Sequence, residues 1–219
     1  MKKVRAGLAK FQHEVFPRNR DLFESLAGGQ NPEALFLTCS DSRIDPCLLT
    51  QTKPGDIFIC RNAGNIVPAY GDVVGGVSAT IEYAVLGLGV KDIVICGHSD
   101  CGAMKALLNP RHVAHMPSVS AWLRYGESAR FVVEENHSHL SGEERLNALI
   151  EANVRAQMDN LRTHPSVAAR LAKGALTLHG WTYDIASGEV KEFNPARGSF
   201  IPIDETEPAR GHTGVRLAS

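Results

Sequence analysis

The sequence has no uninterrupted apolar run long enough to cross a bilayer, so we expect no transmembrane segment. It starts with basic residues, but Lys10, His13 and Glu14 interrupt the apolar stretch that a secretory signal peptide would need. The formal net charge is only −1, with 23 basic and 24 acidic side chains mixed along the chain, which gives no electrostatic reason to expect nucleic acid or a membrane as a partner. Together these absences predict a cytoplasmic protein.

The number of cysteines in the chain is odd. Five cysteines in a chain without an export signal argue against a disulfide framework. We interpret Cys47, Cys60 and Cys96 as small buried hydrophobic residues, because free cysteine is among the most buried residue types. Cys39 and Cys101 need another explanation.

Short apolar runs alternate with helix-like segments along the chain. Residues 34–39, 56–61 and 92–98 are apolar runs that end in polar or reactive residues, as expected of strands buried on both faces of a parallel sheet. Helical spacing is found in residues 73–89, 101–108, 118–135, 142–163 and 165–173. This alternation predicts an α/β fold with a mainly parallel central β-sheet flanked by helices.

The length of 219 residues and the absence of an internal break predict a single domain over residues 1–219. Within residues 1–30, apolar side chains recur at helical spacing and Pro17 interrupts them, so we expect an N-terminal helical arm. Residues 175–193 are interpreted as two extended runs joined by a turn. A poorly packed tail is expected over residues 203–219.

Two motifs carry groups that can bind a metal ion, and each directly follows a predicted strand. The first is Cys39-Ser40-Asp41-Ser42-Arg43, and the second contains His98 and Cys101. Taken separately, each is explained as well by a buried cysteine or a hydrogen-bonded histidine. However, the carboxyl ends of parallel strands lie along one edge of a sheet, where ligands gather, so Cys39 can approach His98 and Cys101.

Two thiolates and one imidazole suit Zn²⁺, since sulfur and nitrogen are its preferred donors. Neither motif holds a further cysteine or histidine, so the fourth position is left to water or to Asp41. An open position of this kind is typical of a catalytic zinc site. The sequence therefore predicts Zn²⁺ bound by Cys39, His98 and Cys101.

Asp41 and Arg43 are two residues apart, so they point the same way in an extended segment. They are interpreted either as an exposed ion pair of little energetic value or, beside a metal, as a catalytic pair. In the second case Arg43 keeps Asp41 ionised and oriented, and Asp41 accepts a hydrogen bond from hydroxide on the metal. Asp41 could also bind the zinc itself when Arg43 releases it, which would close the site.

The segments CSDSR (39–43) and GHSDCGAMKALL (97–108) resemble those of the β-class carbonic anhydrases. The resemblance extends from the N-terminal helices to about residue 203. Residues 116–130 and 160–167 are similar in particular to the bacterial members that accompany cyanase. The resemblance implies reversible hydration of CO₂ to bicarbonate and a proton, with an N-terminal arm that wraps a neighbouring subunit in a homodimer or homotetramer.

Several site residues are implied by the same resemblance. Cys39, His98 and Cys101 match the zinc ligands, and Asp41 and Arg43 match a gating pair. Substrate contacts are implied for Gln30 across the dimer interface, for the Gly102 backbone N–H, and for Val67 and Tyr83 beside an apolar pocket. The alternatives are a plain turn residue for Gln30 and core packing for Val67 and Tyr83.

Phe36 departs from the pattern of those family members that bind inhibitory bicarbonate at a second site. These members use a Trp three residues before the first ligand cysteine, together with an Arg and a Tyr, and here the three positions are Phe36, Arg61 and Tyr183. Because Phe has no indole N–H to donate, we expect this regulatory site to be absent or weak.

Three other functions are compatible with parts of the sequence. The same motifs would serve hydrolysis of carbon disulfide or carbonyl sulfide, which relatives also perform. A zinc-binding protein without catalytic activity is the second alternative, but metal storage has no need of the Asp41–Arg43 pair. A nucleotide-binding domain is suggested by Gly71, Gly75 and Gly76, yet these do not form G-x-G-x-x-G after a strand.

Overall fold

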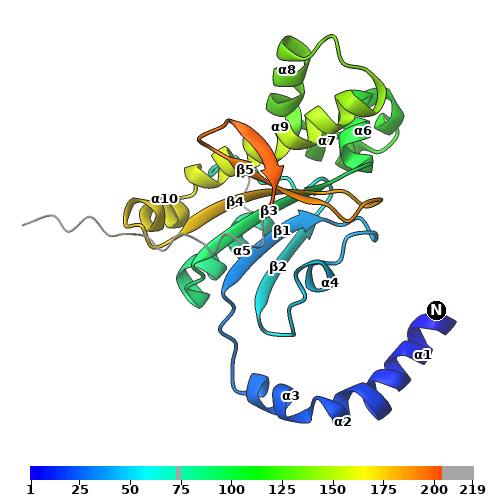
Figure 1. Cartoon of the computed structure of the whole chain (residues 1–219), viewed down its shortest axis with the longest axis vertical. Coiled ribbons are helices and arrows are strands. Elements are labelled where there is room, and N and C mark those ends of the chain that lie inside the picture. The colour runs from blue at the N-terminus through cyan, green and yellow to red at the C-terminus, as the bar shows by residue number, and fades with distance from the viewer. Residues whose placement is uncertain (73–74, 204–219) are drawn as a thin grey trace, which may run out of the picture.

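The computed structural model describes residues 1–72 and 75–203 (Figure 1). The tail predicted over residues 203–219 therefore lies, from residue 204 on, outside the described part. At the centre is a six-stranded sheet in the order β2-β1-β3-β4-β5-β6. The strands are β1 Ala34–Cys39, β2 Ile57–Asn62, β3 Asp92–His98, β4 Thr177–Tyr183, β5 Val190–Asn194 and β6 Ser199–Pro202.

The first four strands pair in parallel, whereas β4–β5 and β5–β6 pair antiparallel. The predicted mainly parallel sheet is confirmed, with an antiparallel extension at one edge. Ser199–Pro202 forms β6, which the apolar pattern of the sequence does not predict. A tight turn at Gly198, with φ of 65°, returns the chain from β5 so that the two short strands pair.

Helices cover the sheet and form the arm (Figure 1). The described α-helices are α1 Lys2–Lys10, α2 Phe16–Arg18, α3 Arg20–Ala27, α4 Pro46–Thr50, α5 Gly76–Glu82, α6 Gly102–Leu108, α7 Pro117–Leu123, α8 Glu127–Asn136, α9 Gly142–Thr163 and α10 Pro165–Ala172. Single-turn π-helical segments are η1 Phe11–Val15 and η2 Tyr83–Leu88, and 3₁₀ turns are η3 Pro110–Val113 and η4 Arg124–Gly126. The helix α4 was not predicted, although Asp45 caps it by accepting a hydrogen bond from the Leu48 N–H and Pro46 occupies its first position.

The apolar runs of β1 and β3 are buried on both faces, as expected of central parallel strands. On one face, Leu35 and Leu37 of β1 pack in a core that includes Val154 of α9 and Val167 of α10. On the other face, Phe36 packs edge-on against Trp181 of β4, with 6.0 Å between ring centroids. The alternation of side chains along a strand thus divides one apolar run between two cores.

The arm, α1 to α3, stands away from the rest of the chain in Figure 1 and contains no buried residue. Its helices are confirmed, and η1 precedes Pro17, which cannot donate a backbone hydrogen bond. Large apolar side chains remain exposed on it, including Val4, Leu8 and Phe11. Because its own chain does not cover these groups, the arm has apolar surface available for another subunit.

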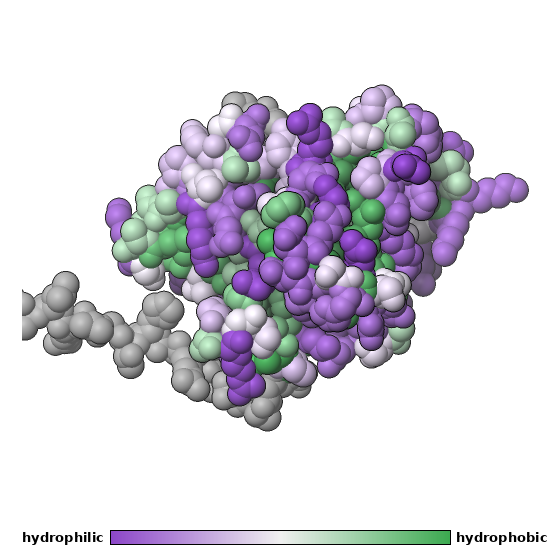
Figure 2. Space-filling model, turned by 90° about the horizontal axis from the view of Figure 1, so that it is seen from above, coloured by the Kyte–Doolittle hydropathy of each residue, from purple (hydrophilic) through white to green (hydrophobic). Residues whose placement is uncertain are grey.

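All five cysteines are free, and Cys60 and Cys96 are buried on strands, where desolvation raises the pKa of each thiol. Their predicted packing role agrees with these positions, whereas Cys47 of α4 is only half-buried. Among the described residues, no helix combines the length and apolar character needed to cross a bilayer. The face seen in Figure 2 is mainly hydrophilic, with small separate hydrophobic areas.

His179 on β4 joins three strands through two carboxylates. Its Nδ1 lies 2.7 Å from Glu192 Oε1 of β5, and its Nε2 lies 3.0 Å from Asp92 Oδ1 of β3. These contacts, with Glu192 first, raise the pKa of His179, and His179 lowers the pKa of Glu192. The imidazolium therefore stabilises the fold below the ordinary histidine pKa, and this stabilisation is lost as pH rises through the raised pKa.

We accordingly expect His179→Gln to lower the thermal unfolding midpoint more at about pH 6 than at about pH 9. The difference between the two pH values should be about 2–4 °C, which corresponds to roughly 1 kcal/mol in a chain of this size. Thermal unfolding of both proteins across pH measures it. An equal loss at every pH would show that the ring contributes by packing alone.

Candidate metal centre

Cys39, His98 and Cys101 are brought together at the carboxyl edge of the sheet. Their ligating atoms all lie within 4.8 Å of one another, and the three side chains are buried. The two sulfurs are 4.0 Å apart, and two sulfurs about 2.3 Å from one tetrahedral zinc would lie about 3.8 Å apart. The predicted approach of the two motifs is confirmed.

The local structure explains why the three side chains meet. Cys39 ends β1 and His98 ends the neighbouring strand β3, so both reach the same edge. Asp100 then takes a left-handed conformation, with φ of 58°, and turns the chain so that Cys101 stands as the N-cap of α6. Asp and Asn tolerate this conformation better than most residues.

His98 is oriented as a metal ligand would be. Its Nδ1 lies 2.8 Å from the Ser99 carbonyl oxygen, which can only accept, so Nδ1 carries the hydrogen and Nε2 keeps its lone pair. Nε2 is buried and has no hydrogen-bond partner among the described residues. A buried polar atom without a partner is costly, and a cation beside the two sulfurs would satisfy it. The residues present therefore fit a zinc ion.

The thiols of Cys39 and Cys101 are within hydrogen-bond distance of each other. This contact lowers the pKa of Cys39 and raises that of Cys101. The backbone N–H of Gly64 also donates to the Cys39 sulfur at 3.3 Å and lowers its pKa. Gly64 has a φ of 80°, and an added Cβ would lie 3.0 Å from both Ala103 and Met104, so only glycine brings its N–H this close.

Asp41 lies beside the ligands and is held by Arg43. Arg43 Nε donates to Asp41 Oδ1 at 2.9 Å, and Arg43 Nη2 donates to Oδ2 at 2.8 Å. This bidentate contact holds the pKa of Asp41 well below its usual range. Asp41 Oδ2 is 3.9 Å from His98 Nε2, so the carboxylate borders the ligand set while both of its oxygens face Arg43.

The residues implied for substrate contact occupy different positions. Gly102 begins α6 directly after Cys101, and Val67 is fully buried in the core shared with α5 and α9. Tyr83 is 54% exposed on η2 and its ring contacts Phe58.

Gln30 is exposed before β1, at the end of the sheet opposite Cys39. Since β1 alone spans roughly 20 Å, Gln30 is remote from Cys39 in its own chain.

Arg61 has a role in the site loop that the sequence interpretation missed. Its Nε donates to the Cys39 carbonyl oxygen at 3.0 Å, and its Nη2 donates to the carbonyl oxygens of Asp41 and Ile44. Because these acceptors are backbone carbonyl oxygens, no side-chain pattern in the sequence signals the contact. Phe36 is buried against Trp181. The side chain of Arg61 is thus engaged by backbone carbonyl oxygens, and that of Phe36 is apolar. The absence of a second bicarbonate site stays a prediction.

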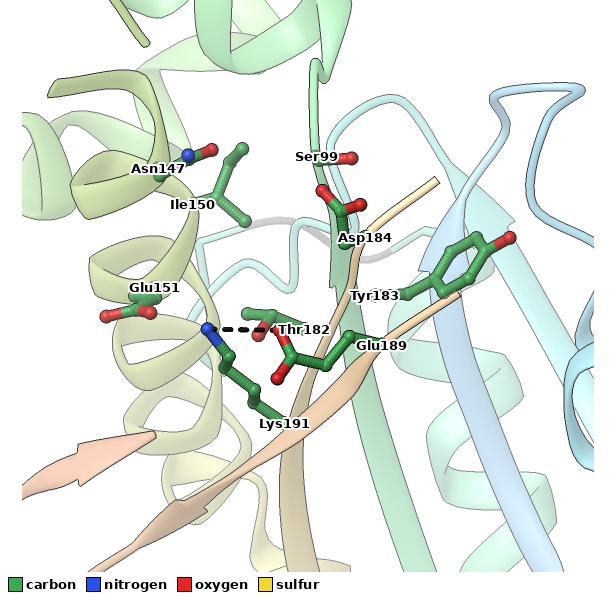
Figure 3. A pocket seen from close by; sticks show the side chains of 9 residues that line it. All are labelled: Ser99, Asn147, Ile150, Glu151, Thr182, Tyr183, Asp184, Glu189 and Lys191. Carbon is green, nitrogen blue, oxygen red and sulfur yellow. Dashed lines mark ion pairs between the residues drawn. The ribbon is translucent and has the colours of Figure 1, made fainter. Parts of the chain in front are cut away.

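A small cavity of about 130 Å³ lies on the other side of the end of β3 and is drawn in Figure 3. It is lined by Ser99 and by residues of α9, β4 and β5, with a 3.3 Å ion pair between Lys191 and Glu189. Burial raises the pKa of Glu151 at its wall. None of the three candidate metal ligands lines this cavity, so it is separate from the metal centre.

Comparisons with known proteins identify relatives over most of the chain. The family profile described as "Carbonic anhydrase" matches residues 34–190. A carbonic anhydrase of Pseudomonas aeruginosa is 50% identical over 98% of this chain and 97% of its own, and carbonic anhydrase 1 of Escherichia coli O157:H7 is 53% identical over 93% and 92%.

Solved structures give the same result. The β-carbonic anhydrase CcaA is 45% identical, with a TM-score of 0.91 over 93% of this chain and 99% of its own. A tetrameric β-carbonic anhydrase of Sordaria macrospora is 32% identical, with a TM-score of 0.80 over 88% and 96%.

Proposed function

This chain belongs to the β-class carbonic anhydrases, and we propose that it carries out their zinc-dependent hydration of CO₂ with Cys39, His98 and Cys101 as the zinc ligands. The observation that carries this assignment of residues is the buried, unpartnered Nε2 of His98 facing two sulfurs 4.0 Å apart. Nothing favours hydrolysis of carbon disulfide or carbonyl sulfide, or a zinc protein without activity. The similarity to cyanase-associated members stays a prediction.

A zinc ion held by these three side chains would supply Lewis acidity, which makes water a stronger nucleophile. Backbone groups of the chain orient the ligands for this ion. Ser99 fixes the ring of His98 through its carbonyl oxygen, and Gly64 supports Cys39 as a thiolate. Burial of all three ligands excludes competing water from their side of the site.

Asp41 acts as an oriented hydrogen-bond acceptor in this proposal. Its low pKa keeps it ionised, and Arg43 fixes the plane of its carboxylate beside the ligand set. While Arg43 holds both oxygens, Asp41 cannot ligate zinc, and release of Arg43 would allow the closed arrangement. The backbone N–H of Gly102, exposed at the start of α6, is proposed to stabilise negative charge on the substrate.

We further propose a homodimer or homotetramer of single-domain subunits, each comprising residues 1–219 with the arm at residues 1–30. The exposed apolar side chains of the arm support this assembly, as does the tetrameric state named for the Sordaria relative. The position of Gln30, remote from Cys39 in its own chain, supports its role across a subunit interface. A cytoplasmic location is proposed from the five free cysteines.

The function is tested by zinc analysis together with stopped-flow CO₂ hydration from about pH 6 to about pH 9. Two thiolates neutralise the formal charge of Zn²⁺, so the pKa of its water should lie above the value of about 7 found with three histidines. We therefore expect stoichiometric zinc and a rate that rises toward alkaline pH. Full activity in metal-free protein would refute the proposal, and a flat profile would contradict the proposed ligand charge.

A further inference from the structure

Arg43 forms ion pairs with two carboxylates. Besides Asp41, it binds Asp100: Arg43 Nη1 donates to Asp100 Oδ2 at 2.8 Å, and Nη2 donates to the Asp100 carbonyl oxygen at 3.2 Å. Asp100 lies 57 residues away in sequence, in the turn between His98 and Cys101. It therefore links Arg43, which follows β1, to the loop that carries the other two metal ligands.

The two carboxylates do not compete for the same N–H groups of Arg43. Asp41 uses Nε and Nη2, whereas the side chain of Asp100 uses Nη1. A planar guanidinium bound at separate edges is fixed in orientation more firmly than one bound at a single edge. Asp100 therefore supports the contact between Arg43 and Asp41.

The Asp100 carboxylate is itself held in place. Lys105 of α6 forms an ion pair with its other oxygen, Oδ1. Asp100, Lys105 and Arg43 line one wall of an open groove of about 560 Å³, and their side chains are about half exposed. Exposed ion pairs of this kind contribute little to the stability of a fold, so this row of charges is better explained by the orientation that it gives to Arg43.

We propose that Asp100 is a positioning residue for CO₂ hydration, which holds Arg43 against Asp41 and so keeps Asp41 off the zinc ion. This inference rests on the proposed roles of Asp41 and Arg43. It makes Asp100 act only through Arg43, with no contact to substrate. Without the carboxylate of Asp100, Arg43 would release Asp41 more often, and the closed arrangement would become more populated.

The test uses Asp100→Asn and Asp100→Gly, both of which tolerate the left-handed backbone at this position. We expect kcat to fall about 10-fold with little change in KM, at the low end for groups that orient a ligand. Zinc release to a chromogenic chelator should become several-fold slower, because Asp41 would add a fourth ligand. Loss of a nearby negative charge alone would make zinc release faster, so the direction of this change separates the two explanations.

A double variant shows whether the effect of Asp100 on kcat and zinc release depends on Asp41. In an Asp41→Asn background, Asp100→Asn should change neither kcat nor the rate of zinc release further, because its effect passes through Asp41. Glu143→Gln is the matched control, since Glu143 lines the same groove, and it should behave as the wild type. Faster or unchanged zinc release in both Asp100 variants, or an additive loss of kcat in the double variant, would overturn the inference.

The outcomes also separate this inference from the proposed function. If Asp41→Asn lowers kcat and the Asp100 variants match the wild type, only the role of Asp100 is refuted. If Asp41→Asn keeps full activity, the catalytic role of the Asp41–Arg43 pair is refuted, and the inference with it.

Discussion

Replacing Cys101 by alanine is expected to remove the zinc ion and the CO₂ hydration activity together. Cys101 is buried, and its sulfur lies 4.0 Å from that of Cys39. Without it, only Cys39 and His98 of the three ligands remain, too few for a stable protein zinc site. We expect the rate to fall by more than about 1,000-fold, because without the metal the pKa of water would return to its bulk value of about 15.7.

Cys47→Ala is the matched control for this experiment. Cys47 is a free, half-buried cysteine in α4 and is not part of the ligand set. Zinc content by elemental analysis and stopped-flow rates should stay at wild-type values in this variant. Stoichiometric zinc with full activity in Cys101→Ala would rule out Cys101 as a ligand.

Replacing Asp41 by asparagine is expected to lower the rate about 100-fold while leaving zinc bound. Asparagine keeps the size of the side chain but cannot carry the negative charge that Arg43 stabilises. Its amide would also present an N–H where a carboxylate oxygen accepts. The three zinc ligands are untouched, so zinc content should be unchanged.

Asp159→Asn provides the comparison, because Asp159 is a strongly exposed acid that pairs only weakly with Arg162 at 3.8 Å. Its rate should equal that of the wild type. The measurement is stopped-flow hydration under identical buffer conditions, with zinc assayed in each sample. Equal rates for Asp41→Asn and Asp159→Asn would leave the Asp41–Arg43 contact as a surface ion pair without a catalytic role.

Much of the fold could be predicted because its signals are local. The continuous apolar runs before Cys39 and His98 identify β1 and β3, and the 3.6-residue period identifies α9 with its observed bounds. The helix α4 and the strand β6 were missed. Both are short, so they contain too few residues for a period to stand out.

The metal ligands could be predicted from sequence because parallel strands must end along one edge. Asp100 and Lys105 could not, although Asp100 directly precedes Cys101. Their importance depends on the contact between the side chains of Arg43 and Asp100, which are 57 positions apart in the sequence. The same is true of Arg61, whose target is three backbone carbonyl oxygens that no side-chain pattern reveals.

The chemical groups of the site follow from the order of residues alone: two thiols, one imidazole and an aspartate–arginine pair at the ends of two strands. Folding adds which nitrogen of His98 has no partner and which N–H groups hold Asp41. The difference lies in the distance along the chain over which each signal acts. Hydrophobic periodicity reports a residue's relation to its near neighbours, whereas ligand geometry and ion pairing depend on atoms that the chain brings together only when it has folded.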